Sequence, residues 1–578
     1  MSMVSTPAPS VASPSRSPFW LAFDRLTSGA KGPLLAAALV LVSALPGIFA
    51  LPPLDRDEAR FAQASAQMLE TGDLVDIRYL GDARNKKPVG IHWFQAASVQ
   101  LVSAVERRQI WAYRLPSLLG AMVAAAACVW GASSFFTGRA AVFAGAILGA
   151  SLLLSSEAFI AKTDAVLCGA ITLSMAALCR LYGASRGIGE AGRGVKALFW
   201  FGQAIAILDK GPVGPMVAAL ALVALALADR QGRWIKTLGW LWGALLIGLI
   251  VGPWALAITV VTDGGFWTEA VGGDMAAKVL GARERHGAPP GLHLLLLPLL
   301  IFPASLLLPA AAVAGWRERA SPGVRFALCW LIPTWIVFEL SPTKLVHYTL
   351  PLYGAVAWLM AAALNDPARA AFRPRVRWIG GSLSIVCGLV IAAGAITATV
   401  LYGGASAFAW AGLSALLASA TGIVGAVALG KRRIEAGLLA CLILGVGAHL
   451  ALTGLAPRLT ALWPSARVAE RLIKDHLDPR NGVTTGPVAL VGYAEPSLVF
   501  ALGSGTELDN AADGADSVSD GQPAIVEQRQ DAAFRAALAA GHIPAEPVET
   551  VRGFDYSLGK RVALTIWRSL APSTPDAP

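Results

Sequence analysis

The chain has 578 residues, of which 55% are apolar and only 15% are charged, and its mean hydropathy is +0.59. These values exclude a soluble globular protein of this length and favour a polytopic membrane protein. The net charge of +10 does not indicate nucleic-acid binding, because most lysines and arginines lie in short clusters between apolar spans. We therefore expect membrane lipids, and no nucleic acid, as partners of the basic clusters.

The first 30 residues begin with a Pro/Ser-rich stretch that lacks the pattern of a signal peptide, so we expect a disordered cytoplasmic tail over 1–30. Residues 31–455 are predicted to form a membrane domain, because they contain repeated apolar segments of about 20 residues, the length that crosses a bilayer. About thirteen spans can be drawn, near 33–53, 115–136, 140–158, 164–182, 195–209, 211–228, 237–261, 291–314, 324–341, 345–364, 378–401, 406–430 and 434–454. The six cysteines lie in or beside these spans without metal-binding spacing, which is typical of small core residues.

The loop over 54–114 contains a further apolar stretch, Val89–Val105, that could be one more span. If this stretch does not cross, every basic loop between later spans is cytoplasmic, and if it does cross, every one is outside. The positive-inside rule therefore predicts that 89–105 is an amphipathic surface helix and that the whole loop 54–114 faces outside. Because successive loops alternate between the two sides of the membrane, the loops at 159–164, 209–210, 262–290 and 341–347 are also outside. Polar residues from several segments therefore meet at one membrane surface.

After residue 455 the composition becomes that of a small soluble domain, and we expect an α/β domain over 460–570 on the outer side. The stretches "GPVALVGY", "SLVFALG" and "RVALTIWR" predict strands. The stretches "SARVAERLIKDHL" and "DAAFRAALAAG" predict amphipathic helices.

Four consecutive charged residues, Asp55 to Glu58, follow the first span in "LDRDEARF". Asp55, with Glu58 three residues later, is close to a capping box for a helix that begins at Arg56 and ends at Gly72. A carboxylate at the outer end of a span is also well placed to accept a proton from a hydroxyl. The spacing of Asp55 and Glu58 favours the helix cap, but these residues alone leave both roles of Asp55 open.

Other polar motifs also lie at span ends. "RNKKPVGIHW" fits lipid phosphates at the interface or a bound phosphate ligand equally well. "AKTDAVL" holds a carboxylate that is either a helix cap or a site residue. "LDKGPVGP" places Asp209 and Lys210 between apolar stretches, where they must be paired, exposed or functional. "SPTKLVHYTLPLY" brings cationic and hydrogen-bonding groups to one level of the membrane.

In this order, and with "RLPS" at 114–117, the motifs resemble those of the polyprenyl-phosphate-dependent membrane glycosyltransferases of the GT-C type. This class contains the aminoarabinose transferases of lipid A and, more distantly, the protein O-mannosyltransferases. The resemblance covers roughly residues 30 to 365, and "GYAEPSLVFALG" is similar to the periplasmic tail of bacterial members. It implies an all-α membrane domain with juxtamembrane helices, a small C-terminal α/β domain in the periplasm, and a location in a bacterial-type inner membrane.

The resemblance also implies roles for individual residues. Asp55 would be the catalytic base or a metal ligand, and Asp164 the second acidic residue of the site. The donor phosphate would be bound by Lys87, Lys210, Lys344 and, on a looser match, Lys278. The remaining cavity residues would be Asp57, Glu58, Arg60, Lys86, His92, His286, His347 and Tyr348.

One departure from the family pattern is Lys86, where many relatives have a glutamate. This removes one carboxylate from a two-carboxylate metal site and indicates a subgroup whose acceptor differs from lipid A. A divalent metal, with Asp55 as a ligand, is the one cofactor that the resemblance allows.

The expected function is transfer of a sugar from a polyprenyl-phosphate donor to a lipid A-like or other lipid or glycan acceptor on the periplasmic side. One alternative is a protein O-glycosyltransferase, such as an O-mannosyltransferase, whose acceptor is a serine or threonine side chain. A second alternative is a transporter or lipid flippase, which predicts internal repeats and charges in mid-span. Neither feature is evident in the sequence.

Overall fold

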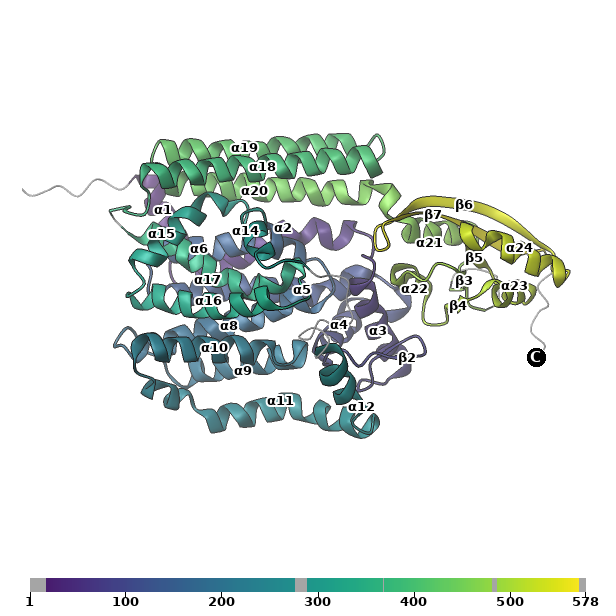
Figure 1. The fold of residues 1–578 in the computed structure, drawn as a ribbon, viewed down its shortest axis with the longest axis horizontal. Helices are drawn as coiled ribbons and strands as arrows, with labels where there is room; N and C mark the ends of the chain where they lie inside the picture. The colour runs from purple at the N-terminus through teal and green to yellow at the C-terminus, as the bar shows by residue number, and fades with distance from the viewer. Residues whose placement is uncertain (1–16, 276–287, 367, 481–485, 571–578) are drawn as a thin grey trace, which may run out of the picture.

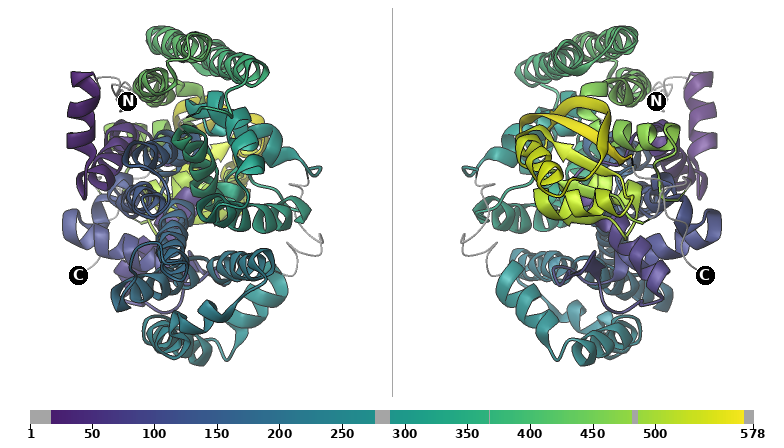
Figure 2. Two further views of the ribbon diagram at one scale, coloured as in Figure 1. Left: turned by 90° about the vertical axis from the view of Figure 1, so that its left-hand side faces the viewer. Right: turned by 90° about the vertical axis from the view of Figure 1, so that its right-hand side faces the viewer.

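The computed structural model describes residues 17–275, 288–366, 368–480 and 486–570. Figure 1 shows a bundle of roughly parallel helices with a small domain at one end. The bundle contains α2 (Lys31–Ala50), α5 (Ile110–Ala132), α6 (Gly138–Ala150), α7 (Leu152–Glu157), α8 (Thr163–Ala184), α9 (Arg193–Lys210), α10 (Val213–Asp229), α11 (Trp240–Val261), α14 (Leu292–Leu300), α15 (Leu308–Arg317), α16 (Pro322–Leu340), α17 (Tyr353–Asn365), α18 (Pro374–Tyr402), α19 (Ala407–Gly430) and α20 (Ile434–Leu455). Figure 2 views these helices end-on, with α18–α20 forming a layer along one edge.

Within the described ranges, eight helices are long and apolar enough to cross a membrane, or nine if a pair bent by 118° at Leu292–Leu300 and Ala304–Arg317 counts as one span. Helices α6 and α10 are apolar but shorter. The chain is therefore a multi-pass membrane protein. The total of thirteen spans stays a prediction.

Small residues let the central helices touch. In the most apolar stretch of helix α8, 89% of the residues are buried, which places this helix in the middle of the bundle. A Cβ on Gly169 of α8 would lie 2.4 Å from the carbonyl oxygen of Gly120 on α5, so the two backbones are in direct contact. Helices in lipid associate mainly through such close packing, because lipid tails are as apolar as the side chains.

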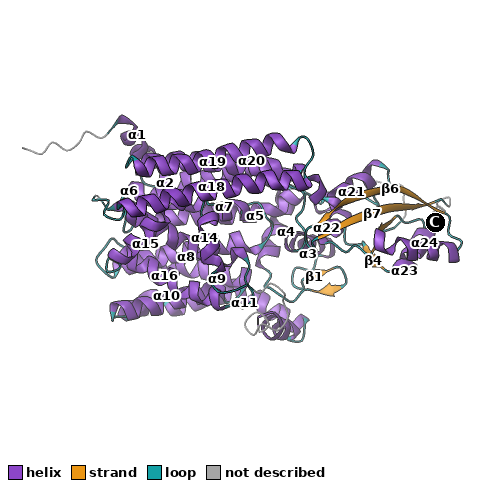
Figure 3. Cartoon of the chain, turned by 45° about the horizontal axis from the view of Figure 1, so that its top comes forward, coloured by secondary structure: helices purple, strands orange, loops and turns teal. Residues whose placement is uncertain are grey.

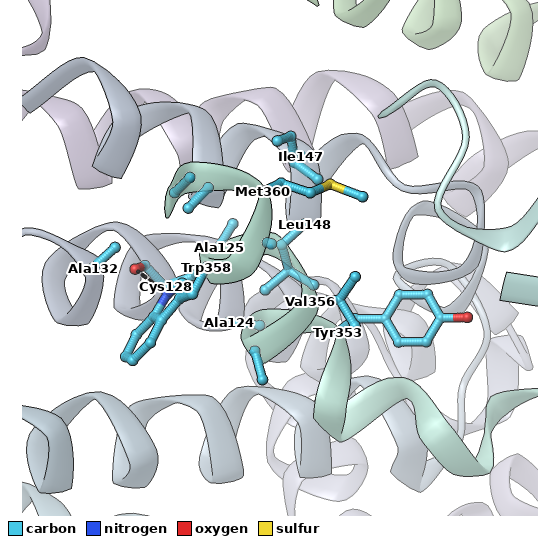
Figure 4. Close-up of a cluster of buried hydrophobic side chains, with 14 of the residues drawn as sticks. Ala124, Ala125, Cys128, Ala132, Ile147, Leu148, Tyr353, Val356, Trp358 and Met360 are labelled. Atoms are coloured by element: carbon cyan, nitrogen blue, oxygen red, sulfur yellow. Dashed lines mark hydrogen bonds between the residues drawn. The ribbon is translucent and has the colours of Figure 1, made fainter. Parts of the chain in front are cut away.

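Figure 4 shows part of the core where α5, α6 and α17 meet. The indole nitrogen of Trp358 donates to the carbonyl oxygen of Cys128 at 3.1 Å, among alanines that leave room for the ring. All six cysteines fall within the described residues, where they are buried and form no disulfide. This confirms that they are core residues.

The loop between α2 and α5 forms a compact layer at the end of the bundle nearest the small domain (Figure 1). It contains α3 (Asp57–Thr71), the hairpin β1 (Arg78–Tyr79) and β2 (Asp82–Ala83), α4 (Gly90–Val102) and the turn η1 (Val105–Arg107). At 13 residues, α4 is too short to span a bilayer, in agreement with the surface helix expected over 89–105. Its polar residues His92 and Gln95 are nevertheless buried against α3, so they do not form an exposed polar face.

The disordered tail expected over 1–30 is wrong for its second half, and residues 1–16 lie outside the described residues. Helix α1 (Pro18–Thr27) begins with a proline at its first turn and packs against α2 and α6. Asp24 accepts hydrogen bonds from Arg139, at 2.5 and 2.7 Å, and the Arg139 guanidinium lies 4.6 Å from the Trp20 ring. These contacts order a segment that composition alone suggested was unstructured.

Several short elements connect the bundle helices. They are η2 (Arg233–Leu238), α12 (Gly265–Trp267), the π-helical η3 (Thr268–Met275), η4 (Ala304–Leu307), η5 (Val346–Leu352), η6 (Ala456–Arg458) and η7 (Thr460–Leu462).

The C-terminal domain is α/β, as expected, and Figure 3 shows that the strands are confined to it and to the β1–β2 hairpin. Its sheet has the order β4-β3-β5-β7-β6, in which β3 is parallel to β4 and β5, and β7 is antiparallel to β5 and β6. The strands are β3 (Ala489–Val491), β4 (Glu507–Asp509), β5 (Ala524–Glu527), β6 (Ala545–Asp555) and β7 (Lys560–Ser569). The helices are α21 (Pro464–Lys474), α22 (Pro496–Leu502), α23 (Ala511–Ser519), η8 (Gln528–Gln530) and α24 (Asp531–Ala540).

The strand predicted at "SLVFALG" is wrong, because this stretch is helix α22. Pro496 starts the helix and Gly503, with φ 112°, ends it. The run is apolar on all sides because Leu498 and Val499 face the domain core while Phe500 faces α3 and α5. A short helix buried on both sides has no periodicity that distinguishes it from a strand.

Candidate active site

Charged side chains from three parts of the bundle meet at the ends of α7, α8 and α9. Lys162, in the break between α7 and α8, lies 3.0 Å from Glu157 and 3.4 Å from Asp164. Lys210, the last residue of α9, lies 2.5 Å from the other oxygen of Asp164. Glu157, Lys162 and Asp164 are buried, so each charge depends on its neighbours for the interactions that water would otherwise provide.

His347, in η5, completes this cluster. The Lys162 ammonium lies 3.3 Å from its Nδ1, and since an ammonium can only donate, Nδ1 accepts and the ring proton is on Nε2. Nε2 lies 3.5 Å from Asp164. Burial lowers the pKa of His347 to about 3, so the ring is neutral and orients two charged groups. The motifs around 164, 210 and 347, far apart in sequence, thus meet as expected.

A second set of charges comes from the loop layer. Arg84 and Lys87 lie over the face of the Phe61 ring, at 4.5 and 5.1 Å from its centre. Asp57, the first residue of α3, is accessible to solvent. Loss of hydration would raise its pKa, but the charges of Lys87, Lys162 and Arg84 outweigh this and hold the pKa below its ordinary value of 3.8. Asp57 is therefore an ionised, accessible carboxylate within electrostatic range of both sets of cations.

Asp55 lies elsewhere, in contact with the C-terminal domain. Its Oδ1 accepts from the backbone N–H of Ser497 at 3.2 Å, and its own N–H donates to Tyr556 Oη at 2.7 Å. Among the described residues it does not cap α3, whose N-cap position is Arg56, so the predicted cap is wrong. The Asp55 side chain points toward α22, where it accepts the hydrogen bond from Ser497, and is therefore not available to cap α3. The catalytic role of Asp55 stays a prediction.

Glu58 is a structural residue, in contrast to the cavity role expected for it. Arg114 donates to both of its carboxylate oxygens at 2.8 Å, and neither side chain is exposed. Glu58 also accepts from the backbone N–H groups of Leu54 and Ala161, at 2.8 and 2.7 Å. The predicted capping box would have used the backbone N–H of Asp55, which donates to Tyr556 instead. The Glu58 carboxylate ties the start of α3 to two neighbouring chain segments.

Several other expected site residues lie outside the charged cluster. The Lys344 ammonium donates to the carbonyl oxygen of Ser341 at 2.6 Å, within its own loop. His92 is buried and its Nδ1 lies 2.9 Å from Ser65 Oγ, and burial lowers its pKa to about 3, so it is a neutral link between α3 and α4. Arg60 and Lys86 are exposed.

Tyr348 does join the cluster, because the Lys210 ammonium lies 5.5 Å from its ring centre. Lys278 and His286 lie outside the described residues.

The expected set omits Glu157, Lys162 and Asp209. Glu157 could have been found because it is a carboxylate within an apolar run. Lys162 and Asp209 lie in the motifs "AKTDAVL" and "LDKGPVGP", in which only Asp164 and Lys210 were expected to be site residues. Asp209 is fully buried, and neither of its carboxylate oxygens has a hydrogen-bond partner among the described residues.

In the part of the chain that the structure describes, no group of three His, Cys, Asp or Glu side chains could hold a metal ion. The donor set around Asp55 therefore does not fit the divalent metal that the resemblance allows.

Comparisons with known proteins agree with the motif series. Residues 86–256 match the family model for dolichyl-phosphate-mannose-protein mannosyltransferase. The chain is 28% identical over 357 residues to the undecaprenyl phosphate-alpha-4-amino-4-deoxy-L-arabinose arabinosyl transferase of Aeromonas hydrophila, covering 60% of this chain and 63% of that protein. It is 30% identical over 333 residues to the protein of the same name from Pseudomonas paraeruginosa, covering 56% and 59%. The chain thus spans less than two thirds of these curated relatives.

The fold is similar to that of ArnT from Cupriavidus metallidurans bound to undecaprenyl phosphate, with a TM-score of 0.71 and 20% identity over 92% of this chain and 97% of that chain. The apo form of the same protein gives a TM-score of 0.70 at 22% identity. The fold match thus extends well beyond the residues that the family model covers. The apolar helices, the curated relatives and this fold together identify the chain as a multi-pass inner-membrane relative of the polyprenyl-phosphate-dependent GT-C glycosyltransferases.

Proposed function

We propose that this protein transfers a sugar from a polyprenyl-phosphate donor to a hydroxyl group of an envelope acceptor. The observation that carries the proposal is the cluster of Lys162 and Lys210 around Asp164, with Lys87 near enough to act electrostatically on both Asp164 and the accessible Asp57. Such a site supplies cations for a phosphate and a base for a hydroxyl. No nucleotide-binding loop is needed, because the sugar arrives already activated on the lipid.

The cations bind the phosphate that leaves. As the bond between the anomeric carbon and the phosphate oxygen breaks, negative charge grows on that oxygen, and fixed cations stabilise the transition state more than the ground state. Lys87 and Arg84 come from the loop layer and Lys210 from the end of α9, so the phosphate sits between them. Asp164, which contacts Lys162, Lys210 and His347, holds two of the ammonium groups in place.

Asp57 accepts the proton of the acceptor hydroxyl. Its accessibility favours this role over Asp55, which is hydrogen-bonded to Ser497 and Tyr556, and its low pKa keeps it in the ionised form that can accept a proton. The hydroxyl oxygen attacks the anomeric carbon from the face opposite the phosphate, so the reaction inverts the anomeric centre. The lipid phosphate leaves with the electron pair of the broken bond.

The acceptor is a lipid or glycan hydroxyl in this proposal, as the resemblance of the motifs to the aminoarabinose transferases of lipid A implies. A protein serine or threonine is the second candidate, because the matching family model describes protein mannosyltransferases. The positive-inside rule supports a cytoplasmic N-terminus, with the site and the C-terminal domain in the periplasm. A transporter is less well supported, because the charged residues gather at span ends and not at mid-membrane depth.

The test compares envelope lipids and glycoproteins by mass spectrometry in cells that contain wild type, Asp57→Asn, or no copy of the protein. We expect a glycosyl-sized mass with wild type only, and the molecule that carries it identifies the acceptor class. Asp82→Asn, which changes an exposed carboxylate in the β1–β2 hairpin, is the matched control and should keep the product. Wild-type product from folded Asp57→Asn would show that Asp57 is not the base.

A further inference from the structure

The C-terminal domain contacts the two short segments that carry the proposed site residues of the loop layer. The first segment is 55–57. Besides the two hydrogen bonds of Asp55 to Ser497 and Tyr556, the Arg56 guanidinium donates to the carbonyl oxygen of Ser557 at 2.6 Å. Three bonds to one domain therefore fix the two residues immediately before Asp57.

Arg56 has an unusual backbone conformation, with φ 64° and ψ −95°. A residue with a Cβ rarely adopts a positive φ, and such a conformation persists only where surrounding contacts hold it. The contacts on one side of Arg56 are those of the C-terminal domain. On the other side Glu58 is fixed by Arg114. If the domain contacts were lost, Arg56 would relax and the direction of the Asp57 side chain would change.

The second segment is the β1–β2 hairpin and the turn that follows it. Tyr79 and Leu80 pack against the core of the C-terminal domain. Gln67 of α3 donates to the carbonyl oxygen of Leu80 at 2.8 Å and accepts from its N–H at 3.0 Å. The hairpin leads within a few residues to Arg84 and Lys87, so the same domain supports the cations of the loop layer.

A separate set of contacts docks the domain farther along α3. Phe500 of α22 lies 5.2 Å from the Tyr113 ring centre, and the Arg108 guanidinium lies 5.8 Å from the Phe500 ring centre. Ser504 accepts from Gln63 at 2.8 Å and donates to Glu70 at 2.5 Å. These contacts keep the domain in place independently of residues 55 and 56, so the two sets can be tested separately.

We propose that the C-terminal domain is a positioning element of the active site: Tyr556 and the backbone N–H of Ser497 hold Asp55, and the carbonyl oxygen of Ser557 holds Arg56, so that Asp57 is directed toward the cations. Asp55 is then a hydrogen-bond acceptor in this clamp and not the base. This inference rests on the proposed function. It gives residues 460–570 a role in the transfer step without contact with the substrate.

The test uses the full-length protein in lipid vesicles with a polyprenyl-phosphate sugar donor. Asp55→Asn keeps an oxygen that can accept from Ser497, whereas Asp55→Ala removes it and Tyr556→Phe removes the acceptor of the Asp55 N–H. We expect Asp55→Asn to keep most of kcat, and Asp55→Ala and Tyr556→Phe to lose about ten- to a hundredfold, the cost of a misplaced catalytic group. The KM for the donor should change little, because the cations are not altered.

Ser504→Ala is the matched control, since it removes docking bonds at the far part of α3 and should keep kcat. Hydrogen exchange provides a readout that does not depend on activity. In Asp55→Ala and Tyr556→Phe, amides of residues 54–58 should exchange faster than in wild type, and those of the second half of α3 should not.

The outcomes separate the two proposals. If wild type transfers sugar but Asp55→Ala and Tyr556→Phe keep its kcat, or if Asp55→Asn is as inactive as Asp55→Ala, the clamp is overturned. If wild type transfers no sugar, the proposed function fails, and unchanged exchange at 54–58 in the variants would overturn the clamp as well.

Discussion

Two neighbouring carboxylates at the start of α3 should have opposite roles. Asp57 is accessible and lies within electrostatic range of cations, whereas Glu58 is fully buried against Arg114. We expect Glu58→Gln to lose stability while the folded fraction keeps its transfer rate. We expect Asp57→Asn to keep stability and lose transfer.

The expected cost for Glu58→Gln follows from the bonds around the carboxylate. Two bonds come from Arg114 and two from backbone N–H groups, so the amide NH2 of a glutamine would meet a donor whichever way it turned. The Arg114 charge would then be buried without a counter-charge. Removing one partner of a buried ion pair costs about 3–5 kcal/mol. Asp57→Asn changes an exposed group and should cost less than about 1 kcal/mol, while loss of a general base lowers the rate by about 10²–10⁴-fold.

The assay is thermal unfolding of the detergent-purified variants, followed by tryptophan fluorescence, together with the transfer rate per folded molecule. Arg114→Met should lose more stability than Glu58→Gln, because Arg114 also donates to four backbone carbonyls near the end of α2. A Glu58→Gln protein that melts like wild type would refute the reasoning. So would an Asp57→Asn protein that is destabilised as strongly as Glu58→Gln.

Three further results are expected. Gly90→Ala should raise the donor KM. The new Cβ would lie 2.6 Å from the carbonyl oxygen of Leu208 in α9, so α4 would move away from α9 and carry Lys87 with it. Lys210→Gln should raise the donor KM about tenfold or more, through loss of a charge-assisted contact, whereas Lys344→Gln should not. Burial and the neighbouring carboxylates Asp55 and Asp555 raise the pKa of Glu495 from 4.5 to about 7, so the stability that its protonated form contributes is full below pH 4.5 and is lost as the pH rises through 7. Melting temperatures between pH 4 and 8 should fall with rising pH, and less so in Glu495→Gln; equal slopes would contradict this.

Much of the fold could be predicted because it is encoded over short distances. Apolar runs bounded by basic clusters predicted a polytopic membrane protein, and the change of composition after residue 455 predicted the α/β domain. Polar motifs at span ends indicated that Asp164, Lys210 and His347 would meet, which they do. Helices that end at one membrane surface bring their terminal residues to one level, so this convergence follows from the threading of the chain.

The roles of adjacent residues could not be predicted in the same way. Whether Asp55, Asp57 or Glu58 faces cations, an arginine or another domain depends on contacts with residues far away in the sequence. Asp55 bonds to Tyr556, which is 501 residues distant, and Glu58 to Arg114, which is 56 residues distant. Likewise, α22 is a helix because both of its sides are buried, and no local pattern records that. The sequence by itself determined the membrane class and the motifs that form the site. Only the tertiary structure decided which partner each of the carboxylates Asp55, Asp57 and Glu58 has, because burial and long-range hydrogen bonds outweigh local helix-capping preferences.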